Sequence, residues 1–512
     1  MKKRTGESCS IFEEIDGLFL GMKIILIAFF ALCGSSASFA QGFPHTTLGQ
    51  LAEDFIQSIN SGDEKQQLAF FHSYESSPIV GMGADRWMQW MTFFNQQLGG
   101  VEVIDIQPSA DTASITMTLR GKKGSHWMEL RTQLIRSEPG KLDGFGAKMA
   151  EDPLVTKQYQ WPHKVADESA IAGEIDRHAI HLTDIGQFSG VVLIAKNDKA
   201  IFEKAYGLAD QTFKVPNDMA TRFCIGSMNK MFTSVAIGQL VEAGKLSYTD
   251  TLAKVLPDYP NQAIAKRITI AQLLTHTSGL GDYFKDEFFT HRDKYVALRS
   301  YLPIFQNDSL LFAPGTSWSY SNAGFLVLGL VVEKVSGEDY FEYISRHIYG
   351  PAGMHHTDSY KSDSVVANLA TGYTSSGGFD PLRLNPRIMN WETLPVKGSS
   401  AGGGYATAGD FLRFSIALKN HTLLSAALTD TVLSGKVFDI MGVGKEDKYG
   451  FGFEDYTMRG KHIAGHGGGA PGMNGEFRVF RDGSYTVIVL SNYDPPSATA
   501  LSRQILSFLL DQ

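Results

Sequence analysis

Near the N-terminal end, apolar residues recur at the spacing of an amphipathic helix. Leu48, Leu51, Phe55 and Ile59 are three or four positions apart, so they share one helical face, and Gly62 then supplies a stop. This pattern predicts a helix that ends before Gly62 and buries one face.

A second helix and several strands are predicted in the same segment. The helix is indicated by an aromatic and apolar stripe that ends at Gly99-Gly100: Trp87, Trp90, Met91, Phe94 and Leu98. Alternation of apolar and polar positions then indicates strands, with apolar positions at Ile115, Met117, Leu119, Met128 and Leu130. Residues 44–150 are therefore predicted to form a small α+β domain, and this order of helices and sheet resembles the nuclear transport factor 2-like fold. The segment holds no set of acid, base and nucleophile, and its aromatic stripe is interpreted as core packing.

The pattern changes at about residue 167, after a linker predicted over residues 151–166 that contains Pro153 and Pro162. Residues 188–207 predict a hairpin that turns at Asn197-Asp198, and residues 475–494 predict another that turns at Asp482-Gly483. Helices are predicted between and after the hairpins, over Ser227–Gly244, Phe325–Gly337 and Ala498–Leu510. Residues 167–512 are thus expected to form a mixed α/β domain, in which helices cover one sheet.

Length, composition and charge fit this two-domain interpretation. A chain of 512 residues exceeds what one hydrophobic core usually supports. The formal net charge of -8 is modest, and no basic block is present. Nucleic acid is therefore not expected as a partner.

Residues 1–40 are interpreted as an N-terminal extension followed by a secretory signal. Met22-Lys23 precedes ten apolar residues, and small residues then lead to Ala40. We expect cleavage after Ala40 and translation from Met22 rather than Met1. Ten apolar residues are too few to span a bilayer, and no later segment is long and apolar enough. The mature protein is expected to be periplasmic or extracellular, without a stable membrane span.

Cys224 is the one cysteine that follows the predicted signal, since the other two are Cys9 and Cys33. The mature chain therefore cannot form an intramolecular disulfide. Cys224 precedes Ser227 closely enough to be considered as a nucleophile, but no base is tied to it. We expect a buried apolar role for it.

Ser227 and Lys230 are three residues apart at the start of a predicted apolar helix. Residues at this spacing share a helical face, so the lysine amine can reach the serine hydroxyl. A serine hydroxyl needs a neighbouring base to become a nucleophile. Lysine can be that base when burial lowers its pKa, and the flanking residues are apolar enough for this. A capping serine beside a surface lysine is the plain alternative.

Two further motifs follow in the chain. Residues 314–329 contain Tyr320-Ser321-Asn322 before an apolar helix, and residues 463–472 contain His466-Gly467-Gly468 at the expected edge of a strand. Glycines there let the backbone approach a substrate, where a free N–H can stabilise an oxyanion. With residues 273–280 (LLTHTSGL) and 401–414 (AGGGYATAGDFLRF), this set resembles the serine β-lactamase and penicillin-binding-protein superfamily, in its class C β-lactamase, DD-peptidase and esterase branch.

The resemblance covers residues 167–512 and implies an antiparallel sheet flanked by helices. It also implies site roles: Ser227 as the acylated nucleophile, with Lys230 and Tyr320 sharing the proton transfers. Asn322, His466 and Gly468 would bind substrate, and the N–H groups of Ser227 and Gly469 would form the oxyanion hole. It implies no cofactor and no metal, and a small-molecule or peptide ester or amide as substrate. Oligomeric state is not predicted.

His466 departs from the family pattern, because β-lactamases of this branch usually have lysine there. A neutral imidazole binds a carboxylate less well than a fixed cation does. An exported serine hydrolase of esterase or peptidase type is therefore favoured. The alternatives are a DD-peptidase or β-lactamase and, in another class, a catalytically silent binding or regulatory protein. The hydroxyls and imidazole of residues 275–278 are expected to be structural, bonding backbone at a helix end.

Overall fold

The computed structural model describes residues 43–73, 84–96, 98–109, 114–122, 127–134, 142–150, 161–375, 386–438 and 447–512. The chain divides into two compact units, Met1–Thr156 and Lys157–Gln512. The predicted signal (1–40) and most of the predicted linker (151–166) lie outside the described residues. The boundaries predicted for both, and for the two domains, stay predictions.

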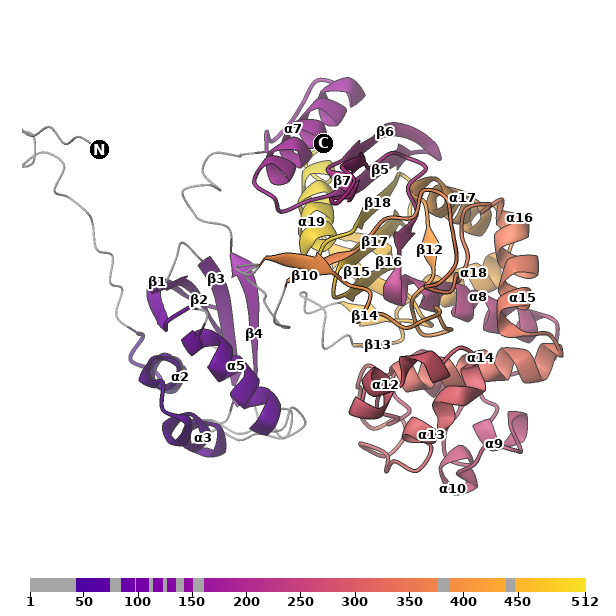
Figure 1. Cartoon of the computed structure of the whole chain (residues 1–512), viewed down its shortest axis with the longest axis horizontal. Coiled ribbons are helices and arrows are strands. Elements are labelled where there is room, and N and C mark those ends of the chain that lie inside the picture. The colour runs from indigo at the N-terminus through magenta and orange to yellow at the C-terminus, as the bar shows by residue number, and fades with distance from the viewer. Residues whose placement is uncertain are drawn as a thin grey trace, which may run out of the picture. The chain divides into compact units, whose positions relative to one another are not determined.

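The first unit places helices before an antiparallel sheet, in the order expected from the sequence (Figure 1). The sheet has four strands in the order β1-β2-β3-β4. The elements are α2 (Thr47–Ser61), α3 (Glu64–Ser73), α5 (Ala84–Gln96), β1 (Val101–Pro108), β2 (Ser114–Gly121), β3 (Trp127–Leu134) and β4 (Leu142–Ala150). Both predicted helices are confirmed, and α2 ends where Gly62 takes φ of +63°. The likeness to the nuclear transport factor 2 fold stays a prediction.

The aromatic stripe of α5 packs in the core of this unit. Trp87 is fully buried, and its ring stacks on Phe55 of α2 and Phe70 of α3 at centroid distances of 5.4 and 5.6 Å. Its Nε1 donates to the carbonyl of Gln67 over 3.1 Å. These contacts agree with the interpretation of the stripe as core.

The second unit is built on an eight-stranded antiparallel sheet in the order β13-β14-β15-β16-β17-β18-β5-β6. The strands are β5 (Gly190–Lys196), β6 (Lys199–Tyr206), β13 (Val437–Phe438), β14 (Lys448–Tyr449), β15 (Glu454–Met458), β16 (Lys461–Ala470), β17 (Met473–Phe480) and β18 (Tyr485–Ser491). Both predicted hairpins are present, as β5–β6 and β17–β18. Asn197 and Asp198 have positive φ, as a tight hairpin turn requires.

Alternate residues of the central strands enter two hydrophobic cores, one on each face of the sheet. Val192 and Ile194 of β5 pack with α7 (Glu168–Asp184) and α19 (Ser497–Leu509). Val191 and Leu193 pack on the other face, in the core that contains α8 (Asn229–Glu242), α14 (Asn322–Ser336) and α17 (Ala408–Lys419). Burial of both faces explains why β5 is apolar from Val191 to Ala195. The predicted sheet covered by helices is confirmed, and Figure 1 shows these layers.

The three long helices predicted in this unit are also confirmed, with small shifts of their ends. The predicted helix from Ser227 begins as a short 3-10 turn, η1 (Gly226–Met228), and continues as α8. Helix α14 begins three residues before Phe325, because Ser321 caps it: the Ser321 hydroxyl accepts the N–H of Gly324 over 2.9 Å.

Shorter elements complete the unit, and several gather beside α14 in Figure 1. The short helices are α9 (Leu252–Val255), α10 (Gln262–Ala265), α11 (Ile270–Leu274), α12 (Asp286–Thr290), η2 (Arg292–Lys294), η3 (Leu298–Tyr301), α13 (Leu302–Phe305), α15 (Tyr340–Ile344), η4 (Ser345–Tyr349), α16 (Gly350–Ala352) and α18 (Ala426–Leu433). The short strands are β7 (Leu208–Asp210), β8 (Val215–Pro216), β9 (Phe223–Cys224), β10 (Tyr373–Ser375), β11 (Arg387–Met389) and β12 (Tyr405–Ala406).

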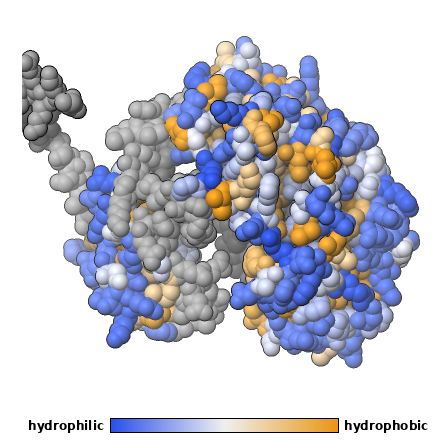
Figure 2. Space-filling view, viewed as in Figure 1, coloured by the Kyte–Doolittle hydropathy of each residue, from blue (hydrophilic) through white to orange (hydrophobic). Residues whose placement is uncertain are grey.

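Two further findings concern the surface. Within the described residues, no helix is both long and apolar enough to cross a membrane. The face of the second unit drawn in Figure 2 is mainly hydrophilic, with hydrophobic residues in separate small patches.

Candidate active site

Ser227 lies at the start of α8, on a turn that glycine makes possible. Gly226 has φ of +51°, which L side chains rarely adopt. A Cβ at Gly226 would also come within 2.8 Å of the Met473 Cε. Ser227 is partly exposed, whereas Lys230 one turn later is fully buried. The turn therefore presents the hydroxyl at the surface and the amine beneath it.

Three oxygen atoms surround the amine of Lys230. Nζ lies 3.1 Å from Ser227 Oγ and 2.7 Å from Asn322 Oδ1, and it also donates to the carbonyl of Ala401. The amide oxygen and the carbonyl can only accept hydrogen bonds. In a neutral amine they take both N–H groups, so the lone pair is left for the hydroxyl of Ser227. This geometry suits removal of the serine proton.

Burial favours the neutral amine. Desolvation lowers the pKa of Lys230 from 10.5 to about 7, and the charge of Asp282 opposes this shift. The Nζ atom lies over two aromatic faces, 4.7 Å from the ring centroid of Tyr320 and 5.5 Å from that of Phe325, and these contacts, like the charge of Asp282, favour the ammonium form and oppose the shift. A base poised near neutral pH is what general base catalysis requires.

Asn322 connects this lysine to a carboxylate. While its Oδ1 accepts from Lys230, its Nδ2 donates to Asp282 Oδ2 over 2.7 Å. The amide is therefore fixed in one orientation. Asp282 is half-buried, and burial raises the pKa of its carboxyl group.

The ring of Tyr320 packs at a tilt against a buried histidine. The ring centroids of Tyr320 and His276 are 4.2 Å apart, and that of His466 is 6.5 Å from Tyr320. His276 Nδ1 accepts the backbone N–H of Ser321 over 3.0 Å, while Thr275 Oγ1 donates to the carbonyl of Ala271 over 2.9 Å. The prediction that residues 275–278 bond backbone at a helix end is confirmed for these two residues.

His466 has both ring nitrogens engaged within the protein. Nδ1 faces the carbonyl of Gly467 at 2.5 Å, so it must carry the proton. Nε2 then accepts from the hydroxyl of Tyr449 over 2.9 Å. Burial lowers the pKa of His466 to about 4, although Glu454 opposes the shift. The imidazole is therefore neutral, buried and already bonded on both sides.

The glycine run of β16 passes beside the nucleophile. Strand β15 pairs with β16 only as far as Gly465, so residues 466–470 extend beyond its end. A Cβ at Gly468 would lie 2.1 Å from the carbonyl oxygen of Ile225, and the N atom of Gly469 is 3.4 Å from the Cβ position of Gly226. Only glycine permits this approach, which brings the Gly469 backbone close to the turn that carries Ser227.

Cys224 was the other residue of the sequence considered as a nucleophile. Burial raises the pKa of the Cys224 thiol to about 11, so the thiol is not activated. Within the described residues, no group of His, Cys, Asp and Glu side chains is arranged to hold a metal ion.

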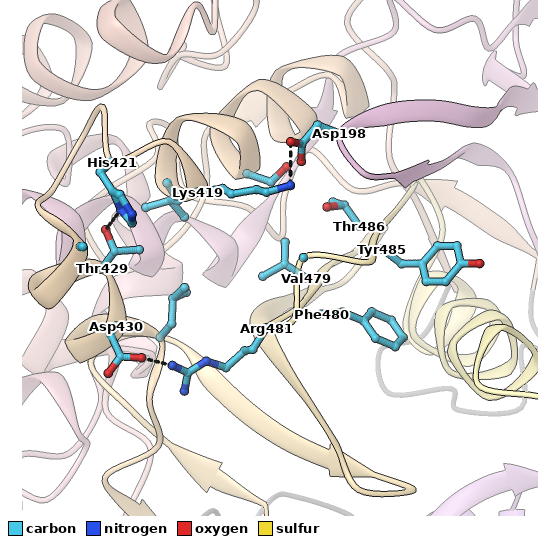
Figure 3. A pocket seen from close by; sticks show the side chains of 15 residues that line it. Asp198, Lys419, His421, Thr429, Asp430, Val479, Phe480, Arg481, Tyr485 and Thr486 are labelled. Atoms are coloured by element: carbon cyan, nitrogen blue, oxygen red, sulfur yellow. Dashed lines mark hydrogen bonds and ion pairs between the residues drawn. The ribbon is translucent and has the colours of Figure 1, made fainter.

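A separate pocket lies at the far ends of β17 and β18, and Figure 3 shows it. Its volume is about 230 Å³, and none of the predicted site residues lines it. Lys419 donates to Asp198 over 2.7 Å, and Arg481 is paired with Asp430. The charged side chains labelled in Figure 3 thus form ion pairs with one another. The amine of Lys230 beside Ser227 instead faces uncharged oxygen atoms.

The sequence missed two members of the cluster. Asp282 lies in a loop where no spacing links it to Asn322, forty residues later. Tyr449 lies beside His466 because β14 and β16 flank β15 in one sheet, which only the topology reveals. Ala401 stands first in the AGGGY stretch that the sequence did single out.

Comparisons with known proteins agree with the fold of the second unit. The family model described as "Beta-lactamase" matches residues 175–510. Penicillin-binding protein 4* of Bacillus subtilis (strain 168) is 31% identical over 317 residues, which are 60% of this chain and 68% of that protein. The crystal structure of a penicillin-binding protein from Bacillus halodurans is 33% identical, with a TM-score of 0.57, and covers 64% of this chain and 99% of that chain. EstCE1, described as a hydrolase with promiscuous acyltransferase activity, shares the fold at 24% identity and a TM-score of 0.56, over 67% of this chain and 99% of that chain.

Fold and site together define a serine hydrolase built on an antiparallel sheet between helical layers. The chain belongs to the beta-lactamase family, and thus to the serine β-lactamase and penicillin-binding-protein superfamily. The resemblance of the sequence motifs to this superfamily is confirmed.

Proposed function

We propose that this protein cleaves an ester or amide through an acyl-enzyme on Ser227. The observation that carries the proposal is the burial of Lys230 together with the position of its Nζ atom, which lies within hydrogen-bond distance of Ser227 Oγ, Asn322 Oδ1 and the Ala401 carbonyl. A capping serine beside a surface lysine would not need a fully buried amine.

In the proposed reaction, Lys230 takes the proton of Ser227 as Oγ attacks the substrate carbonyl. The carbonyl oxygen becomes an oxyanion, held by the N–H groups of Ser227 and Gly469. The bond to the leaving group then breaks, and the proton reaches that group through Lys230 and Tyr320. Water attacks the acyl-enzyme in the second half: Lys230 takes its proton and returns a proton to Ser227 Oγ as the acyl bond breaks. No cofactor takes part in these steps.

The state of His466 favours substrates without a carboxylate beside the scissile bond. A neutral imidazole with both nitrogens bonded offers neither charge nor a free donor to such a group. A cavity of about 200 Å³, whose wall includes Met473 and Trp391, has only uncharged lining residues. Met473 also lies against Gly226, next to the nucleophile. We infer that the acyl part of the substrate is uncharged and that the type is esterase or amidase.

A DD-peptidase or β-lactamase is the second candidate. It is favoured by the identity of 31% to penicillin-binding protein 4* and 33% to the Bacillus halodurans protein. Release of D-alanine from peptides, or a lasting penicillin adduct on Ser227, would select this candidate. A silent binding protein is the third, and normal labelling of Ser227 by a fluorophosphonate would exclude it.

We also propose that the protein is exported, because residues 22–40 have the composition of a secretory signal. Expression in a bacterial host followed by N-terminal sequencing tests this. The mature chain should begin at Gln41, and a chain retained in the cytoplasm with an intact N-terminus would contradict the proposal.

Hydrolysis of a neutral aryl ester by purified protein tests the proposed function. Ser227→Ala should lose turnover to background, while Ser425→Ala, which alters an exposed serine, should keep it. Full activity in Ser227→Ala would remove Ser227 from the reaction.

A further inference from the structure

His276 adopts a backbone conformation that few side chains share. It directly follows the C-cap of α11, and its φ of +58° lies in the left-handed region. Glycine or asparagine is the usual residue there. The side chain is also fully buried. A buried histidine in a disfavoured conformation points to contacts that its ring supplies.

These contacts hold the backbone on both sides of Tyr320. The N–H of Ser321 donates to His276 Nδ1 over 3.0 Å, and the N–H of Ser319 donates to the His276 carbonyl, also over 3.0 Å. One residue therefore binds the amide before Tyr320 and the amide after it. The left-handed conformation turns the carbonyl and the ring of His276 toward the same short segment.

The ring of His276 also packs on the phenol ring itself. Its centroid lies 4.2 Å from that of Tyr320 and 4.6 Å from that of Tyr449. Because Nδ1 accepts a hydrogen bond, the neutral ring carries its proton on Nε2, which has no hydrogen-bond partner among the described residues. Desolvation, Lys230 and His466 hold the pKa of His276 well below its usual range, so the accepting form persists.

We propose that His276 is a positioning residue that fixes Tyr320 where its phenol delivers a proton to the leaving group. The inference rests on the proposed acyl-enzyme reaction and deepens it. The proton that leaves Ser227 passes by way of Lys230 and Tyr320 to the departing oxygen or nitrogen, as the carbonyl carbon gains the Ser227 oxygen. When His276 is replaced, Tyr320 loses its position and the leaving group departs unprotonated.

The dependence of rate on leaving group tests this role. A p-nitrophenyl ester expels a stable phenolate that needs no proton, whereas an ethyl ester of the same acid must be protonated as it departs. In His276→Gly, which keeps the left-handed backbone accessible, kcat for the ethyl ester should fall about a hundredfold with little change in KM. For the p-nitrophenyl ester the loss should stay below about fivefold. Tyr320→Phe should show the same pattern, and adding His276→Gly to it should cost little more.

A control variant and a second substitution of His276 complete the test. His421 shares the φ of +58° but is exposed and lies in the separate pocket of Figure 3, so His421→Gly should leave both rates unchanged. If His276→Gly fails to fold, His276→Asn, which tolerates the same backbone, is judged by the same ratio of rates. Equal losses on both esters, in an enzyme that Ser227→Ala inactivates, would overturn the role of His276 alone. Activity that survives Ser227→Ala would instead overturn the proposed function.

Discussion

The Nζ atom of Lys230 lies 3.1 Å from the Oγ of Ser227, at the floor of a site where the serine is partly exposed and the lysine is not. The same burial that makes the ammonium form unfavourable turns the amine into a base.

The pH dependence of kcat/KM should report the titration of Lys230. The base must be unprotonated, so the rate should rise with pH through an apparent pKa near the value of about 7 and level off above it. Initial rates with a neutral ester between pH 5 and 9 measure this. A flat profile, or one that falls through pH 7, would exclude a buried lysine base.

The stability of the protein should depend on pH through the same group. The unfolded chain binds the lysine proton up to about pH 10.5, whereas the folded chain releases it near 7, so unfolding takes up a proton between these values. Relative to Lys230→Met, the free energy of unfolding of the wild type should therefore increase by about 1.4 kcal/mol per pH unit between pH 7.5 and 9.5. Urea titrations of both proteins at several pH values measure the difference. A difference that does not change with pH would mean that Lys230 has an ordinary pKa.

Asp282 should raise the pKa of Lys230. Its charge stabilises the ammonium form, so Asp282→Asn should move the rising limb of the rate profile to lower pH. The asparagine oxygen can accept from Asn322 Nδ2, as Oδ2 of Asp282 does, but the bonds that Oδ1 accepts from the N–H groups of Tyr283 and Phe284 are then lost. Asp308→Asn is the matched control, because Asp308 pairs with Lys285 at the surface of the same region. If the rise of kcat/KM with pH occurs at the same pH in Asp282→Asn as in the wild type, Asp282 is uncharged at the pH of the assay.

Much of the site could be predicted from the sequence because its chemistry is local. The spacing of Ser227 and Lys230 places both on one helical turn, and Tyr320 and Asn322 precede a helix whose N-cap, Ser321, lies between them. The hairpins and the long helices could also be predicted, because their apolar residues recur at regular spacing and Asn197-Asp198 marks a turn.

The rest depends on contacts between distant parts of the chain. Nothing in the sequence pairs Asp282 with Asn322, and a loop residue has no period that would reveal a partner. His466 is the clearest example. From the sequence its ring nitrogens were expected to bind substrate, whereas in the folded sheet Nε2 is bonded to the hydroxyl of Tyr449. Side chains that meet across strands of a sheet follow from topology and register, which local patterns do not determine.

Gly468 should tolerate no side chain. A Cβ there would collide with the carbonyl of Ile225 at 2.1 Å, so Gly468→Ala must push β16 away from the segment that leads to Ser227. We expect kcat/KM to fall at least about a hundredfold. Gly173→Ala is the control, since nothing lies within 4 Å of its Cβ position in α7. It should keep full activity and gain about 0.5–1 kcal/mol of stability.

The enzyme should prefer leaving groups without a carboxylate. For two esters that differ only in whether the leaving group carries a carboxylate or its methyl ester, kcat/KM should favour the neutral one by about tenfold or more. The reason is that His466 is neutral and bonded on both sides. A preference of similar size for the charged ester would contradict this prediction and favour a DD-peptidase.

The most direct test of the central claim is the intact mass of the protein after brief reaction with a neutral activated ester or a fluorophosphonate, followed by peptide mapping. The wild type should gain one adduct, located on Ser227, and the adduct should form faster as the pH rises through 7. Ser227→Ala should gain none. An adduct of equal yield in Ser227→Ala, or none in either protein while the ester is still hydrolysed, would contradict an acyl-enzyme on Ser227.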